Sequence, residues 1–217
     1  MQAETTPSSW TSGLILAGLA AVCTALVAVT HSSTAPRIAA NEQAYLEQSL
    51  QPVLQGIEYD GNLSESTITI TPPHELPGDE DVPVYRVYAD GTPVAALFVV
   101  RAMDGFSGPI RLLVGIDARG AISGVRVLEH RETPGLGDLI EADKSDWIQQ
   151  FNGKSLTSPA VSVWAIKRDG GEFDQLTGAS VTPRAIIKAI KETLIYFEAN
   201  RVSVFAAAAD GLEEASE

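Results

Sequence analysis

The chain has 217 residues, 45% of them hydrophobic, and a formal net charge of −13 at pH 7. This length allows one ordinary domain with an appendage, and the hydrophobic content is sufficient for a folded core. So acidic a chain repels phosphate backbones, which argues against nucleic-acid binding. Because Cys23 is the only cysteine, an intramolecular disulfide and a cysteine-based zinc or iron–sulfur site are excluded.

An uncharged apolar stretch at residues 11–30 follows a short N-terminal tail at 1–10. About 20 residues of helix, at roughly 1.5 Å each, match the ~30 Å hydrocarbon core of a bilayer. Trp10 stands at one end, where an indole prefers the membrane interface. A cleaved signal peptide is the alternative, but the apolar run exceeds the usual ~7–15 residues and no basic region precedes it. We therefore predict an uncleaved transmembrane anchor, whose orientation the flanking charges do not determine.

Three further regions follow the anchor. Residues 31–55 are expected to form a linker and an amphipathic helix that ends near Pro52, because apolar side chains recur on one helical face. Residues 56–205 form the main domain, and 206–217 form an acidic tail.

The first half of the main domain has the pattern of an antiparallel sheet. A short strand is expected at 67–70, followed by hairpins at 82–102 and 110–130. Their turns are predicted at Asp90-Gly91 and Arg119-Gly120, and Asp-Gly is a strong signal for a two-residue hairpin turn. Apolar and polar residues alternate along these strands, as in a half-buried sheet.

The second half is expected to supply helices that flank the sheet. Short helices are predicted at Asp138–Glu141 and Ser145–Phe151, a further strand at Ala160–Ile166, and a long final helix from Thr182 to about Arg201. Strands followed by helices, without βαβ alternation, indicate an α+β fold.

Small and hydroxylated residues crowd together at the start of the final helix. Thr177, Ser180 and Thr182 supply three hydroxyls, while Gly178 and Ala179 leave room for a ligand beside the backbone. Free N–H groups and partial positive charge at a helix N-terminus suit a phosphate. The simpler interpretation is that Thr182 caps the helix and Gly178 makes a turn. The glycine patterns of the Walker and Rossmann nucleotide sites do not occur.

The segment DQLTGASVT, Asp174 to Thr182, resembles the flavinylation motif D-x-x-[S/T]-G-A-[S/T]-x-T, and every defined position is matched. This motif belongs to FMN-binding subunits of the Rnf electron-transport complex and of the sodium-pumping NADH:quinone reductase. The resemblance implies that a flavin transferase, using FAD and Mg²⁺, joins FMN to Thr182 through a phosphoester. It also implies that Asp174 serves recognition by the transferase. The remaining motif residues implied at the cofactor are Thr177, Gly178, Ala179 and Ser180.

A second block, HRETPGLG from His130 to Gly137, resembles the H-x-E-T-P-G-L-G segment that helps enclose the flavin in the same families. Without that resemblance the block is interpreted as a glycine turn after a strand, with His130 in a structural role. Trp147 is a further candidate for a wall of the flavin ring, and a core tryptophan is an equal alternative. The cofactor residues implied by this block are Glu132, Thr133, Leu136 and Gly137.

The length and the single apolar helix are closest to the G component of the Rnf complex; the C component of the quinone reductase is usually longer and is the alternative. The resemblance implies a single-pass protein of the bacterial inner membrane with its soluble domain in the periplasm. There it would relay electrons through covalent FMN between other membrane subunits, coupling ferredoxin/NAD redox chemistry to ion translocation. We expect no metal site and no independent turnover of a substrate. An anchored binding or scaffold domain without cofactor is the competing hypothesis.

Overall fold

The computed structural model describes residues 9–59 and 66–206. The chain divides into two compact units, Met1–Leu46 and Glu47–Glu217. Of the acidic tail predicted at 206–217, all but residue 206 lies outside the described residues.

The first helix, α1, runs continuously from Ser9 to Val53, through the residues expected to form a linker. Within it, the exposed segment Ser12–Ile38 has a mean hydropathy of 2.3 and is long and apolar enough to cross a membrane. The described chain thus contains one candidate membrane span, which overlaps the predicted 11–30 and continues to Ile38. The helix ends one residue after Pro52, close to the predicted end.

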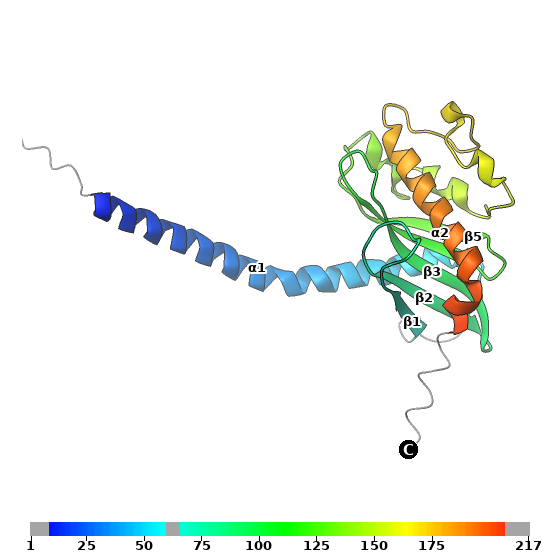
Figure 1. The fold of residues 1–217 in the computed structure, drawn as a ribbon, viewed down its shortest axis with the longest axis horizontal. Helices are drawn as coiled ribbons and strands as arrows, with labels where there is room; N and C mark the ends of the chain where they lie inside the picture. Colours follow the sequence, from blue (N-terminus) through cyan, green and yellow to red (C-terminus); the bar gives the residue numbers. More distant parts are fainter. Residues whose placement is uncertain (1–8, 60–65, 207–217) are drawn as a thin grey trace, which may run out of the picture. The chain divides into compact units, whose positions relative to one another are not determined.

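A five-stranded antiparallel sheet forms the centre of the second unit, with its strands in chain order (Figure 1). Both predicted hairpins are confirmed, and the first turns at Asp90 and Gly91 with φ of 48° and 72°. Positive φ at both central residues matches the right-handed twist of the flanking strands. The strands are β1 Thr67–Ile70, β2 Val82–Ala89, β3 Thr92–Ala102, β4 Ile110–Asp117 and β5 Ile122–Glu129.

The final helix, α2, runs from Val181 to Ala206 and packs across β3 and β4 (Figure 1). Its apolar stripe is buried against the sheet, and the rings of Phe197 and Phe98 lie 6.1 Å apart, edge to face. The helix continues past the predicted end because its last turn also has partners. Phe205 lies against the Tyr88 ring, and its carbonyl accepts a 3.2 Å hydrogen bond from the Tyr88 hydroxyl. The fold is α+β, as predicted.

The opposite face of the sheet receives the end of α1 at a pair of glycines. Gly115 and Gly124 face each other across β4 and β5. A Cβ on Gly115 would overlap the Val53 side chain, and a Cβ on Gly124 would lie 2.9 Å from the Val53 Cα. The last turn of α1 therefore sits where two side chains are missing, so that both faces of the sheet are covered.

The segment between the sheet and α2 differs from the prediction. The strand predicted at Ala160–Ile166 is wrong, because the backbone there forms a 3₁₀ turn, η4 Val161–Val163, with the Val163 N–H bonded to the Ala160 carbonyl at 3.0 Å. Trp164 and Ile166 are still buried, which accounts for the apolar sequence. The two short helices occur as 3₁₀ helices, η2 Gly137–Ile140 and η3 Asp146–Phe151; a last one, η5, is Lys167–Asp169.

Candidate functional site

Thr182 lies in the first turn of α2 with none of its surface exposed. Its hydroxyl donates a short hydrogen bond to Oε2 of Glu132. The helix begins at Val181, so the interpretation of Thr182 as the N-cap is wrong. The hydroxyl is directed instead at a carboxylate from a distant part of the chain.

Glu132 is held in place from several sides and is only 5% exposed. Its Oε1 accepts a 2.9 Å hydrogen bond from the backbone N–H of Ser107, in the loop between β3 and β4. Gly137 allows this packing, because a Cβ there would lie 2.8 Å from the Glu132 Cβ and 2.9 Å from its Oε2. The two carboxylate oxygens therefore have two different donors, one from a loop backbone and one from Thr182.

His130 supports the backbone of the same segment. Its Nδ1 accepts a 3.0 Å hydrogen bond from the N–H of Glu132, so the proton of the neutral ring is on Nε2, which lies 2.7 Å from Glu141 Oε1. His130 therefore has a structural role: it orients the segment that carries Glu132.

A pocket of about 180 Å³ opens above Thr182. The Gly178 backbone, with φ of +82°, comes so close to Leu136 that an added Cβ would be 3.2 Å from its Cδ2. Leu136 is 43% exposed and Phe106 69% exposed, so the rim is apolar while the floor carries the threonine–glutamate pair. The lining residues are Phe106, Glu132, Thr133, Leu136, Gly137 and the run from Gly178 to Thr182.

The structure brings most of the predicted site residues to this pocket, although the two blocks lie some forty residues apart. Three predicted residues are placed elsewhere. Thr177 is exposed and does not line the pocket. Trp147 is buried, with its indole N–H donating to the Asp174 carbonyl at 2.7 Å and its ring against Phe151. The Asp174 carboxylate is exposed and pairs with Lys167 at 2.7 Å. Trp147 thus occupies the core position that was its alternative interpretation.

The loop between β3 and β4 is the part of the site that sequence reasoning missed. It contributes Phe106 to the rim and the Ser107 N–H to Glu132. Gly105 is required there, because a Cβ would overlap the Gly108 carbonyl. An aromatic residue between two glycines in a hairpin loop is the only local signal, and it does not indicate which distant residues the loop meets.

Two cations in the first turns of α2, Arg184 and Lys188, are engaged in ion pairs. Arg184 forms a bidentate pair with Asp169 at 2.6 and 2.9 Å, and its hydrogen bond lowers the pKa of that carboxyl. Arg184 also donates to the Ser180 hydroxyl at 3.2 Å. Lys188 pairs with Asp104 at 2.6 Å. A phosphate at Thr182 would therefore be stabilised first by the N-terminal end of α2, which carries partial positive charge.

Lys144 forms ion pairs with two carboxylates that follow Gly137 in the chain. It lies 2.9 Å from Asp138 and 2.6 Å from Glu141. Its hydrogen bond lowers the pKa of Asp138. Burial raises the pKa of Glu141, but the hydrogen bonds from Lys144 and His130 outweigh burial, so the net shift is downward. In turn, the hydrogen bond to Glu141, which has the larger effect, and the hydrogen bond to Asp138 raise the pKa of Lys144.

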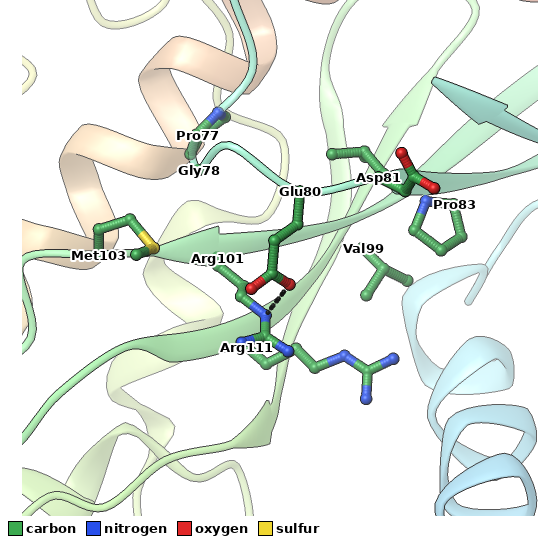
Figure 2. A pocket seen from close by; sticks show the side chains of 10 residues that line it. Pro77, Gly78, Glu80, Asp81, Pro83, Val99, Arg101, Met103 and Arg111 are labelled. Carbon is green, nitrogen blue, oxygen red and sulfur yellow. Dashed lines mark ion pairs between the residues drawn. The ribbon is translucent and has the colours of Figure 1, made fainter. Parts of the chain in front are cut away.

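A second hollow, of about 230 Å³, lies along β2 and β3 and contains none of the predicted site residues (Figure 2). Glu80 and Arg101 point toward each other across it and form an ion pair of 3.2 Å. Because its lining carries both acidic and basic side chains, this hollow does not favour a ligand of one charge. The pocket above Thr182, with a polar floor and an apolar rim, is the better candidate for a binding site.

The pocket fits part of a flavin nucleotide. Sites that enclose a drug-sized ligand are usually about 300–1,000 Å³, so a pocket of about 180 Å³ would hold the phosphate end and leave the ring near the rim. A hydroxyl on the floor, a helix N-terminus beside it and a glycine without a side chain all suit a phosphoester. In the described residues, no group of three or more His, Cys, Asp or Glu side chains could hold a metal ion.

Comparison with known proteins agrees with this geometry. Residues 105–195 match the FMN-binding domain family, a span that includes every lining residue of the pocket, and residues 1–53 match the RnfG N-terminal region.

Curated relatives match nearly the full length. The G component of the ion-translocating oxidoreductase complex of Shewanella amazonensis is 42% identical over 194 residues, covering 89% of this chain and 90% of the relative. The protein of the same name from Pseudomonas aeruginosa is 42% identical over 206 residues, covering 95% and 96%. That from Pseudoalteromonas atlantica is 40% identical over 196 residues, covering 90% and 91%. The chain belongs to the RnfG family, the G components of ion-translocating oxidoreductase complexes.

Proposed function

We propose that this protein carries FMN joined by a phosphoester to Thr182 and relays electrons between other membrane subunits of an Rnf-type complex. A flavin transferase attaches the FMN, using FAD and Mg²⁺. The observation that carries the proposal is the position of the Thr182 hydroxyl, on the floor of a pocket with an apolar rim and in the first turn of a helix. The complex would couple ferredoxin/NAD redox chemistry to ion translocation.

The flavin, once bound, supplies the redox chemistry; the protein supplies attachment and surroundings. The N-terminal end of α2 partly compensates the charge of the phosphodiester. Leu136 and Phe106 offer exposed apolar surface on which the ring can rest. A ring near the rim remains accessible to a partner protein, and the covalent bond prevents its loss to water.

The segment Ser12–Ile38 would anchor the protein as a single pass in the bacterial inner membrane, with the flavin domain in the periplasm. Its exposed apolar surface, with no charged side chain between Ser12 and Thr30, supports a membrane location. The domain's partners in this arrangement are the other membrane subunits of the complex and, during maturation, the flavin transferase.

The direct test is to purify the full chain from membranes of cells that contain the transferase. Fluorescence under ultraviolet light should survive denaturing electrophoresis, and the intact mass should exceed that of the chain by FMN minus water, localised to the peptide that holds Thr182. Thr182→Ala should abolish both signals.

Thr193→Ala is the matched control, since Thr193 is equally buried in α2 but donates its hydrogen bond within the helix, to the Ala189 carbonyl at 2.8 Å. Fluorescence that persists in folded Thr182→Ala would refute the attachment site. A colourless wild-type chain of unmodified mass would favour the cofactor-free scaffold hypothesis.

A further inference from the structure

We propose that Glu132 is the general base that removes the Thr182 proton when the flavin is attached. This inference rests on the proposed function, because it concerns the step by which Thr182 acquires FMN. It assigns a catalytic task to the acceptor protein itself, so that the transferase would not have to supply the base.

The hydrogen-bond arrangement supports this role. The Thr182 hydroxyl donates to Oε2 of Glu132, so the proton is already directed at the carboxylate. The other oxygen, Oε1, accepts from the Ser107 N–H at 2.9 Å, which fixes the orientation of the carboxyl group. Within the described residues, no Lys or Arg forms an ion pair with Glu132, because the nearby lysines pair with other carboxylates, so no cation competes for Oε2.

The close packing around Glu132 also restricts the positions that its side chain can take. The Gly137 backbone is so near that a Cβ there would lie 2.9 Å from Oε2. The N–H of Glu132 is bonded to His130 Nδ1 at 3.0 Å. Such preorganisation is expected for a group that must hold a proton acceptor at a set distance from a nucleophile.

The step balances as a transfer of FMN from FAD. The Thr182 Oγ1 forms a bond to the phosphorus on the flavin side of the pyrophosphate, while the bond from that phosphorus to the bridging oxygen breaks. AMP leaves with the electron pair of the broken bond. The hydroxyl proton passes to Glu132 Oε2 and from there to water or to the AMP phosphate. No oxidant or reductant is consumed.

Access to Thr182 requires a movement of the rim. Thr182 lines the pocket but has no exposed surface, so a phosphorus atom reaches Oγ1 only after neighbouring lining residues shift. The Glu132 side chain approaches Thr182 from the other block of the site, and its second oxygen is held separately by the Ser107 N–H.

The test measures the initial rate of flavin attachment to the full chain in detergent, with purified transferase, FAD and Mg²⁺, by in-gel fluorescence. Glu132→Gln keeps the size and a hydrogen-bonding group but cannot take a proton at neutral pH. We expect its maximal rate to fall about 100-fold or more, within the range of general-base effects, with little change in the concentration of chain that gives half the maximal rate. Glu172→Gln, which changes an exposed carboxylate that does not line the pocket, should label at close to the wild-type rate.

The outcomes distinguish the two proposals. A wild-type rate in Glu132→Gln would overturn the inference and leave the proposed function intact, whereas failure to label the wild-type chain would overturn the proposed function. Thermal unfolding of each variant shows whether it is folded. Should Glu132→Gln not fold, Glu132→Asp takes its place: it keeps a carboxylate but withdraws it by one methylene, and we expect about tenfold slower labelling. A wild-type rate in that variant would overturn the inference.

Discussion

The Thr182 hydroxyl donates a hydrogen bond to the carboxylate of Glu132, fifty residues earlier in the chain, and both side chains are buried. This hydrogen bond joins the two sequence blocks of the site. Its contribution to stability and to the shape of the pocket can be measured separately from the flavin.

Thr182→Val keeps the shape of the side chain and removes the donor. Glu132 Oε2 then loses the threonine hydrogen bond in a buried position, and we expect the free energy of unfolding to fall by about 1–3 kcal/mol. Urea unfolding of the full chain in detergent measures the loss. In a double-mutant cycle with Glu132→Gln, the two changes should couple by about 0.5–3 kcal/mol. Strictly additive effects would show that the hydrogen bond does not contribute.

Gly137→Ala tests whether the glycine is needed for the position of Glu132. The added Cβ would lie 2.8 Å from the Glu132 Cβ, so either the loop or the glutamate must move. We expect a loss of about 1–3 kcal/mol in unfolding free energy, together with slower flavin attachment. Gly18→Ala is the control, because an added Cβ there meets nothing within 4 Å. Unchanged stability and labelling in Gly137→Ala would contradict this crowding around Glu132.

The glycine pair beneath α1 permits a test with an internal control. Gly115→Ala and Gly124→Ala should each destabilise the domain by about 1–3 kcal/mol, as measured by urea unfolding. The added Cβ at position 115 meets the Val53 side chain, whereas that at position 124 meets the Val53 Cα and carbonyl. Val53→Ala should therefore relieve part of the Gly115→Ala defect and none of the Gly124→Ala defect. Equal rescue of both would contradict this packing of the helix end.

The Lys144 cluster predicts a specific loss of stability in acid. The pKa values of Asp138 and Glu141 are lowered in the folded chain, so these groups stabilise the fold above their unfolded pKa values of about 3.9 and 4.3. That contribution falls as the pH drops from about 5 through the lowered folded pKa values. Lys144→Met should flatten this part of the curve of melting temperature against pH. An unchanged slope below about pH 5 would show that the ion pairs do not contribute.

Trp147→Phe separates a core role from a flavin contact. The indole N–H donates to the Asp174 carbonyl at 2.7 Å, and its loss should lower the unfolding free energy by about 0.5–1.5 kcal/mol. Because Trp147 does not line the pocket, the absorption spectrum of the attached flavin should remain unchanged. A shifted flavin spectrum would instead support a place for Trp147 in the wall of the ring.

Much of the fold could be predicted because local chemistry determines it. The apolar run before His31 predicts a membrane span, and Asp90-Gly91 predicts a hairpin because both residues tolerate positive φ. The strand predicted at Ala160–Ile166 failed for a physical reason. Its apolar residues indicate burial, and Trp164 and Ile166 are indeed buried, but burial does not specify a hydrogen-bonded ladder.

The sequence alone determined the membrane-helix pattern, the hairpins and the motif that ends at Thr182, because each depends on residues adjacent in the chain. Only the tertiary structure decided that the Thr182 hydroxyl faces Glu132, that the Ser107 N–H holds that carboxylate, and that Trp147 lies outside the pocket. Packing of α2 against the sheet and the neighbouring loops brings these groups together. Spacing along the chain does not reveal such contacts, since they depend on which distant backbones have room to approach.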